Sequence, residues 1–166
     1  MARQALAICV VALAAAALAG SAAADKPDRG PAPSGPLDFP AGAVCPFAVS
    51  GIPTENRQHL TTFANGKVAF NGYFEAQLTN VANGTSITLN ANGAVRLTPE
   101  GDLLRIQSSG PIIWFLFPGD AGPGDVTTGR TYLVKGNTEV LADPTTFAFL
   151  SFETDGSVTD LCAALA

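Results

Sequence analysis

Two cysteines are the residues of this chain whose chemistry follows most directly from their positions. Cys45 and Cys162 flank most of the sequence, and a third cysteine, Cys9, lies in an apolar leader that we expect to be removed. In an oxidising compartment, the two thiols that remain after cleavage are expected to pair as a Cys45–Cys162 disulfide. The alternatives are two free thiols or a disulfide between two copies of the chain.

Groups for acid–base or nucleophilic catalysis are sparse. His59 is the only histidine, so a nucleophilic triad, a general-base dyad or a zinc site would lack a second imidazole. Glu153 with Asp155 could support glycoside hydrolysis across a cleft, and Asp120 with Asp125 could share a calcium ion, although further oxygen ligands are not visible. Because both pairs are also typical of solvated turns, we expect no catalytic residue, no metal ligand and no cofactor.

The charge of the chain excludes one class of partner. Its net charge at pH 7 is −5, and it has 9 Lys and Arg against 14 Asp and Glu. Nucleic-acid binding requires clustered basic residues, so we expect no nucleic-acid partner.

Residues 1–24 have the pattern of a secretory signal peptide. One basic residue, Arg3, precedes an alanine-rich apolar run, and Ala22-Ala23-Ala24 forms a small-residue cleavage pattern before Asp25. The apolar run is shorter than the ~20 residues that span a bilayer, which disfavours an uncleaved anchor. We therefore expect a secreted, extracellular protein with no membrane association after cleavage.

The rest of the chain divides into a linker and one domain. Residues 25–44 contain five prolines and three glycines, a composition typical of a disordered, semi-rigid linker. Residues 45–166 are long enough for a single hydrophobic core.

The composition of residues 45–166 predicts an all-β domain. Segments rich in Thr, Val, Ile and Phe alternate in polarity and are separated by frequent turn signals, which is typical of short antiparallel strands joined by hairpins. The turn signals are Asn65-Gly66, Asn71-Gly72, Asn83-Gly84, Asn92-Gly93, Glu100-Gly101, Ser109-Gly110, Gly136-Asn137 and Asp155-Gly156. Consecutive hairpins favour a small antiparallel β-barrel closed by the terminal disulfide, with a β-sandwich as the alternative. Residues 159–165 are expected to form a last strand or a helical turn capped by Asp160.

Register follows from the requirement that one face of each hairpin be apolar. Two-residue or three-residue loops at four of the turn signals then produce a five-strand meander. The expected cross-strand pairs are Leu78 with Leu89, Leu89 with Val95, Leu97 with Leu104, and Ile106 with Ile113.

The opposite face of this meander suggests a binding surface. The predicted register aligns Thr88, Arg96, Arg105 and Trp114 in one cross-strand row. A stacking indole beside two cations is what a glycan or small-anion site requires, and Trp114 could also form a cation–π contact with Arg105. The alternative is that residues 112–117, which are apolar throughout, form a central strand covered on both faces.

Three segments carry a resemblance to a known group of proteins. The start Cys45-Pro46-Phe47, the segment from Trp114 to Asp120 and the ending Thr159-Asp160-Leu161-Cys162-Ala163-Ala164-Leu165 resemble small secreted β-rich proteins of high-GC Gram-positive bacteria. These motifs are structural, so the resemblance carries no activity with it.

The sequence therefore predicts a non-catalytic extracellular binding or interaction module. Its partner would be a glycan, a small anion or another extracellular protein. One alternative is a calycin-like carrier of a small apolar ligand, which predicts a cavity lined by Phe74, Leu89, Leu104 and Phe115. A further alternative is a carboxylate-dependent hydrolase that uses Glu153 and Asp155.

Overall fold

A computed structural model describes residues 26–124 and 126–166 of the chain. The predicted signal peptide with Cys9, and the acidic residue Asp125, lie outside these residues. The described residues form ten strands and one short helix, α2 (Leu161–Leu165), and none of their helices has the length and hydropathy needed to cross a membrane. The strands are β1 (Asp28–Pro31), β2 (Leu37–Phe39), β3 (Val49–Thr62), β4 (Val68–Asn80), β5 (Ser86–Asn90), β6 (Ala94–Glu100), β7 (Leu103–Leu116), β8 (Arg130–Ala142), β9 (Phe149–Thr154) and β10 (Ser157–Asp160).

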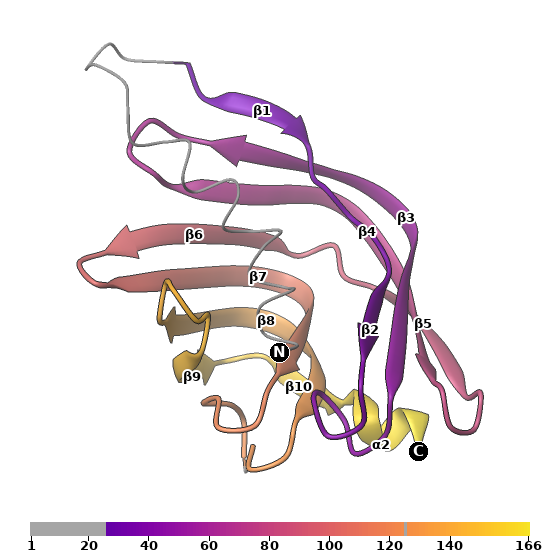
Figure 1. The fold of residues 1–166 in the computed structure, drawn as a ribbon. Coiled ribbons are helices and arrows are strands. Elements are labelled where there is room, and N and C mark those ends of the chain that lie inside the picture. Colours follow the sequence, from indigo (N-terminus) through magenta and orange to yellow (C-terminus); the bar gives the residue numbers. More distant parts are fainter. Residues whose placement is uncertain (1–25, 125) are drawn as a thin grey trace.

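All ten strands belong to one antiparallel sheet, which confirms the all-β prediction. The main order is β1-β3-β4-β6-β7-β8-β10, with β2 beside β3, β5 beside β4 and β9 beside β8. The long strands bend, so that the arm formed by β1, β3 and β4 faces the arm formed by β6 and β7 (Figure 1). The sheet curls without closing, so the expected closed barrel is not seen among the described strands.

Two predicted hairpins exist, each with its register shifted by two residues. Leu78 lies opposite Ile87 instead of Leu89, because Asn80 and Thr85 join across a longer loop in which the Asn80 carbonyl accepts the Gly84 N–H. Leu97 lies opposite Ile106 instead of Leu104, because the two-residue loop is Gly101-Asp102, which places Gly101 (φ 60°) inside the turn. A two-residue shift preserves the face of every side chain.

Two other predicted hairpins are wrong. β5 does not continue into a pairing with β6; instead β6 pairs with the first half of β4, where Leu97 lies opposite Val68. β7 continues without a turn through Ser109-Gly110, and Gly110 lies opposite Gly136 on β8. Both glycines have positive φ, 84° and 150°, so the glycine signal marks a bend in a continuous strand pair and no turn.

The expected disordered linker is also corrected, because most of it is ordered against the sheet edge. β1 and β2 both pair with β3, with Gly30 opposite Leu60 and Asp38 opposite Ser50. Phe39 is 6% exposed. Prolines are compatible with edge strands, where one side of the backbone has no ladder partner, so a Pro-rich segment can pair in this position.

Two hydrophobic clusters cover the two faces of the second half of β7. The first surrounds the disulfide and includes Phe39, Val49, Leu78, Leu133, Leu161 and Leu165, with Ile113 and Phe115 packed against it. The second includes Ile106, Trp114, Leu116, Tyr132, Val134 and Val140. Because the neighbours Trp114 and Phe115 join different clusters, the strand is covered on both faces, as the alternative interpretation of residues 112–117 predicted.

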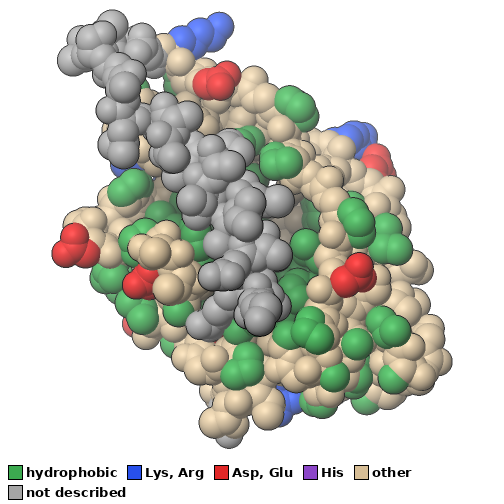
Figure 2. All heavy atoms as spheres, viewed as in Figure 1, with side chains coloured by type: hydrophobic (Ala, Val, Ile, Leu, Met, Phe, Trp, Pro, Cys, Tyr) green, Lys and Arg blue, Asp and Glu red, His purple; other side chains and the backbone are tan. Residues whose placement is uncertain are grey.

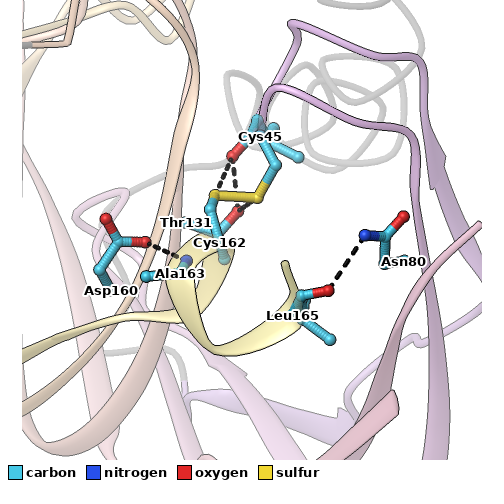
Figure 3. Close-up of a disulfide and its surroundings, with 8 residues drawn as sticks. Cys45, Asn80, Thr131, Asp160, Cys162, Ala163 and Leu165 are labelled. Carbon is cyan, nitrogen blue, oxygen red and sulfur yellow. Dashed lines mark hydrogen bonds between the residues drawn. A yellow bond between two sulfur atoms is a disulfide. The ribbon is translucent and has the colours of Figure 1, made fainter. Parts of the chain in front are cut away.

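The predicted Cys45–Cys162 disulfide is confirmed and joins the start of the domain to α2 (Figure 3). The two Cα atoms lie 5.5 Å apart, within the usual range for disulfides. The Asp160 carboxylate caps α2 by accepting the Ala163 N–H at 3.0 Å, which confirms the capped helical turn. At the other end of α2, the Asn80 side-chain amide donates to the Leu165 carbonyl at 3.0 Å.

Candidate functional site

The curled sheet leaves a cavity of about 1120 Å³ between its two arms. Figure 2 shows hydrophobic side chains over much of this face of the molecule. One wall comes from β3 and β4 and the other from β6 and β7. Their large apolar side chains are Leu60, Phe70, Phe74, Leu78, Leu97, Leu103, Leu104, Ile112, Ile113 and Phe115.

The alternation of side chains along β3 and β4 creates the first wall. Phe70, Phe74, Ala76 and Leu78 lie an even number of residues apart on β4, so they share the face that looks into the cavity. Leu60 on β3 lies directly opposite Phe70 and extends the same face.

The chemistry of the cavity is apolar. None of the described residues that line it is charged, and its polar side chains are Ser34, Gln58, Thr62 and Asn65. Its volume is slightly above the range of about 300–1,000 Å³ for small-molecule sites, which are mostly lined by hydrophobic side chains with a few polar groups. The arrangement can exclude water from an apolar molecule, and its described lining offers no charged acid or base for catalysis.

Residues 33–37, from the predicted linker, form one rim of the cavity. The Ala32 N–H donates to the Gln58 carbonyl at 2.9 Å, and the Asn56 side-chain amide donates to the Ala32 carbonyl at 3.0 Å. These bonds hold the segment along β3, between the short pairings of β1 and β2.

A second part of the rim is the loop that joins β8 to β9, which contributes Pro144 and Phe147. The Asp143 carboxylate accepts the N–H groups of Thr145 and Thr146, both at 2.8 Å, and these bonds lower the pKa of Asp143 below its ordinary value. Phe147 has φ 56°, a left-handed conformation that is strained for a bulky residue. Such strain is often found where a side chain is held for function.

The sequence predicted part of this lining. Of the four residues expected for a carrier cavity, Phe74, Leu104 and Phe115 line it. Leu89 instead packs against the first hydrophobic cluster, because β5 pairs only with the C-terminal half of β4.

The sequence reasoning missed the two rim segments and the pairing that brings the walls together. Leu60 and Phe70 could have been found from their alternation within a predicted hairpin. The contributions of residues 33–37 and of Phe147 have no signal in local periodicity.

The predicted row of Thr88, Arg96, Arg105 and Trp114 is not assembled. Arg96 lies opposite Gln107 instead of Arg105, and Thr88 pairs with Gln77 in the second half of β4, away from the residues of β4 that pair with β6.

Arg105 and Trp114 each have other partners. The Arg105 guanidinium forms ion pairs with Glu139 at 2.6 Å and with Glu100. The hydrogen bonds from Arg105 to Glu100 hold the pKa of Glu100 below its ordinary value. Trp114 is 6% exposed and packs edge-on against Phe149 and Phe152, so its indole does not form a surface platform.

Two of the candidate acidic residues, Asp155 and Asp120, have structural partners. Asp155 accepts hydrogen bonds from the backbone and side chain of Asn137, which lower its pKa. The buried Asp120 accepts the Phe117 N–H at 2.7 Å and the Phe149 N–H at 3.2 Å. Glu153 lies opposite Glu139, and no group of three metal-ligating side chains occurs among the described residues.

Comparisons of the chain with protein-family models, with curated proteins and with solved structures find no match. The cavity itself is therefore the basis for a functional assignment.

Proposed function

We propose that this chain is an exported, non-catalytic binding protein that carries a small apolar molecule in the cavity between its two sheet arms. The observation that supports the proposal most strongly is the uncharged, largely apolar lining of a cavity of about 1120 Å³. Protein interiors are normally close-packed, and a large accessible apolar surface usually marks a binding site. The curled sheet then acts as a calyx, with residues 33–37 and Phe147 at its rim.

Export is part of the proposal. Its support is the signal-peptide pattern of residues 1–24, the disulfide between Cys45 and Cys162, and the resemblance to secreted bacterial β-rich proteins. If the protein is exported, the intact mass of the material recovered from the medium of an expressing high-GC Gram-positive host corresponds to residues 25–166 with one disulfide. Recovery of the full-length chain from the cell alone would contradict export.

The binding proposal is tested with the neutral fluorescent probe N-phenyl-1-naphthylamine. We expect saturable binding at one site and a rise in probe emission on transfer to an apolar environment. Thr62 lines the cavity, whereas its neighbour Thr61 on β3 does not, so the two provide a matched pair. Thr62→Trp should fill the cavity and weaken binding at least about 10-fold, a loss equivalent to ~1.4 kcal/mol, while Thr61→Trp should leave it unchanged.

Equal probe binding by the two variants, with both folded by circular dichroism, would contradict the cavity as the site. Mass spectra of lipid extracts from the purified protein provide a second test, since a carrier should retain an apolar molecule. A positive glycan array combined with no probe binding would instead support a surface interaction module.

A further inference from the structure

One polar side chain stands out in the apolar wall of the cavity. Gln58 lies in the interior of β3 and is half-buried, whereas Ser34 and Asn65 are exposed at the rim and Thr62, also half-buried, is the last residue of β3. Its backbone is already hydrogen-bonded: the N–H donates to Asn56 Oδ1 at 2.9 Å, and the carbonyl accepts the Ala32 N–H. None of the hydrogen bonds found among the described residues uses the Gln58 side-chain amide.

The strand opposite leaves this amide uncovered. Gln58 pairs with Gly72 on β4, and Gly72 has φ 131°. A Cβ atom at Gly72 would lie 2.4 Å from the Arg57 carbonyl oxygen and 2.8 Å from Gln58 Cα, so this position admits only glycine. No cross-strand side chain therefore shields the Gln58 amide from the cavity on that side.

The rest of the described lining favours uncharged molecules as ligands. An ionised group moved from water into an apolar cavity loses its hydration, and the loss is large unless an opposite charge or several hydrogen bonds replace it. The described lining contains no charged residue of either sign, so neither an anion nor a cation would find a counter-charge there. A hydroxyl, ester or amide group costs much less to bury, and one glutamine amide offers it both donors and an acceptor.

We infer that the cavity takes a neutral, lipid-like molecule whose uncharged polar group hydrogen-bonds to the Gln58 side chain. This inference rests on the proposed carrier function. It names the chemical class of the ligand and assigns Gln58 as the residue that orients it.

Competition among ligands of equal chain length tests the inference. The exported protein is loaded with N-phenyl-1-naphthylamine at pH 8 and titrated, below the micelle concentrations, with dodecan-1-ol, dodecanoate or dodecyltrimethylammonium. Dodecan-1-ol should displace the probe at a concentration at least about 30-fold lower than either ion, because only the ions must be desolvated without a counter-charge.

Gln58→Leu and Gln77→Leu form the matched variants. Gln77 lies on β4 between two cavity residues and therefore points to the opposite face. Gln58→Leu should weaken dodecan-1-ol about 5-fold, as expected for loss of one hydrogen bond, whereas Gln77→Leu should leave the affinity unchanged. Thermal unfolding measured for both variants confirms that they are folded.

Each outcome has a separate meaning. Displacement by dodecanoate or dodecyltrimethylammonium as effective as that by dodecan-1-ol would overturn the neutral ligand class while the carrier function stands. Equal dodecan-1-ol affinities in the two variants would overturn the role of Gln58. Absence of saturable probe binding by the unmodified protein would overturn the proposed carrier function itself.

Discussion

Trp114 packs against both Phe149 and Phe152, whose ring centroids lie 5.7 and 5.3 Å from its own at interplanar angles of 79° and 77°. Edge-to-face packing of this kind is favourable because the positive edge of one ring meets the negative face of another. The indole Nε1 is buried, with no hydrogen-bond partner among the described residues. At the scale of single residues, the tryptophan therefore stabilises the second hydrophobic cluster and does not present its ring to solvent.

The environment of Trp114 predicts its fluorescence. Because Trp114 is the only tryptophan and is 6% exposed, the folded protein should show blue-shifted emission that iodide quenches weakly. Unfolding in guanidinium chloride should shift the emission to longer wavelength and restore quenching. Iodide quenching as strong in the folded as in the unfolded protein would show that the indole is exposed and would revive the surface-platform hypothesis.

The bend shared by β7 and β8 is an element-scale feature of the cavity wall, since β7 lines the cavity both before and after it. Gly110 and Gly136 lie opposite each other, both with positive φ, where the strands change direction. Beyond the bend, Trp114 packs on one cluster and Ile113 on the other, so the second half of β7 separates the two hydrophobic clusters. Glycine is needed here because a side chain would meet backbone.

Replacement of Gly136 tests this bend. A Cβ atom at Gly136 would lie 2.4 Å from Gly156 Cα, so Gly136→Ala should cost about 1–3 kcal/mol of unfolding free energy in urea titrations. Gly30 on β1 is the control, because a Cβ there meets no atom within 4 Å and its φ is not positive. Gly30→Ala should change stability by less than about 0.5 kcal/mol. Equal effects of the two substitutions would show that the bend does not depend on glycine.

At the scale of the whole molecule, the disulfide holds together an open sheet. A closed barrel has no free edges, whereas this sheet ends at β1 and β10. The Cys45–Cys162 bond spans a sequence separation of 117 residues and joins the segment that follows β2 to α2, which follows β10. The covalent link therefore connects the two ends of the sheet order through the first hydrophobic cluster.

Removal of the bond tests its contribution. The variant with both Cys45→Ser and Cys162→Ser should lose about 2–5 kcal/mol of unfolding free energy, since an unfolded chain without the link has more conformational freedom. Dithiothreitol should lower the stability of the unmodified protein and leave that of the double variant unchanged. A double variant as stable as the oxidised protein would show that packing alone holds the two ends together.

The sequence by itself determined the β class, the face on which many side chains lie and the cysteine pairing. Alternation has a period of two, so Leu78 and Leu97 were assigned to the apolar face correctly although their partners were wrong by two residues. The pairing of Cys45 with Cys162 followed from the count of cysteines left after the expected cleavage.

Only the tertiary structure decided which strands meet and whether the apolar faces fill the interior. β6 pairs with β4, and residues 33–37 dock on β3, so segments that are distant in sequence lie side by side. The bend at Gly110 likewise depends on its pairing with Gly136 on β8. An alternating pattern is unchanged by a two-residue slip and contains no information on sheet curvature. The cavity, the burial of Trp114 and the position of Gln58 therefore depend on the curvature of the folded sheet, which brings its two arms face to face.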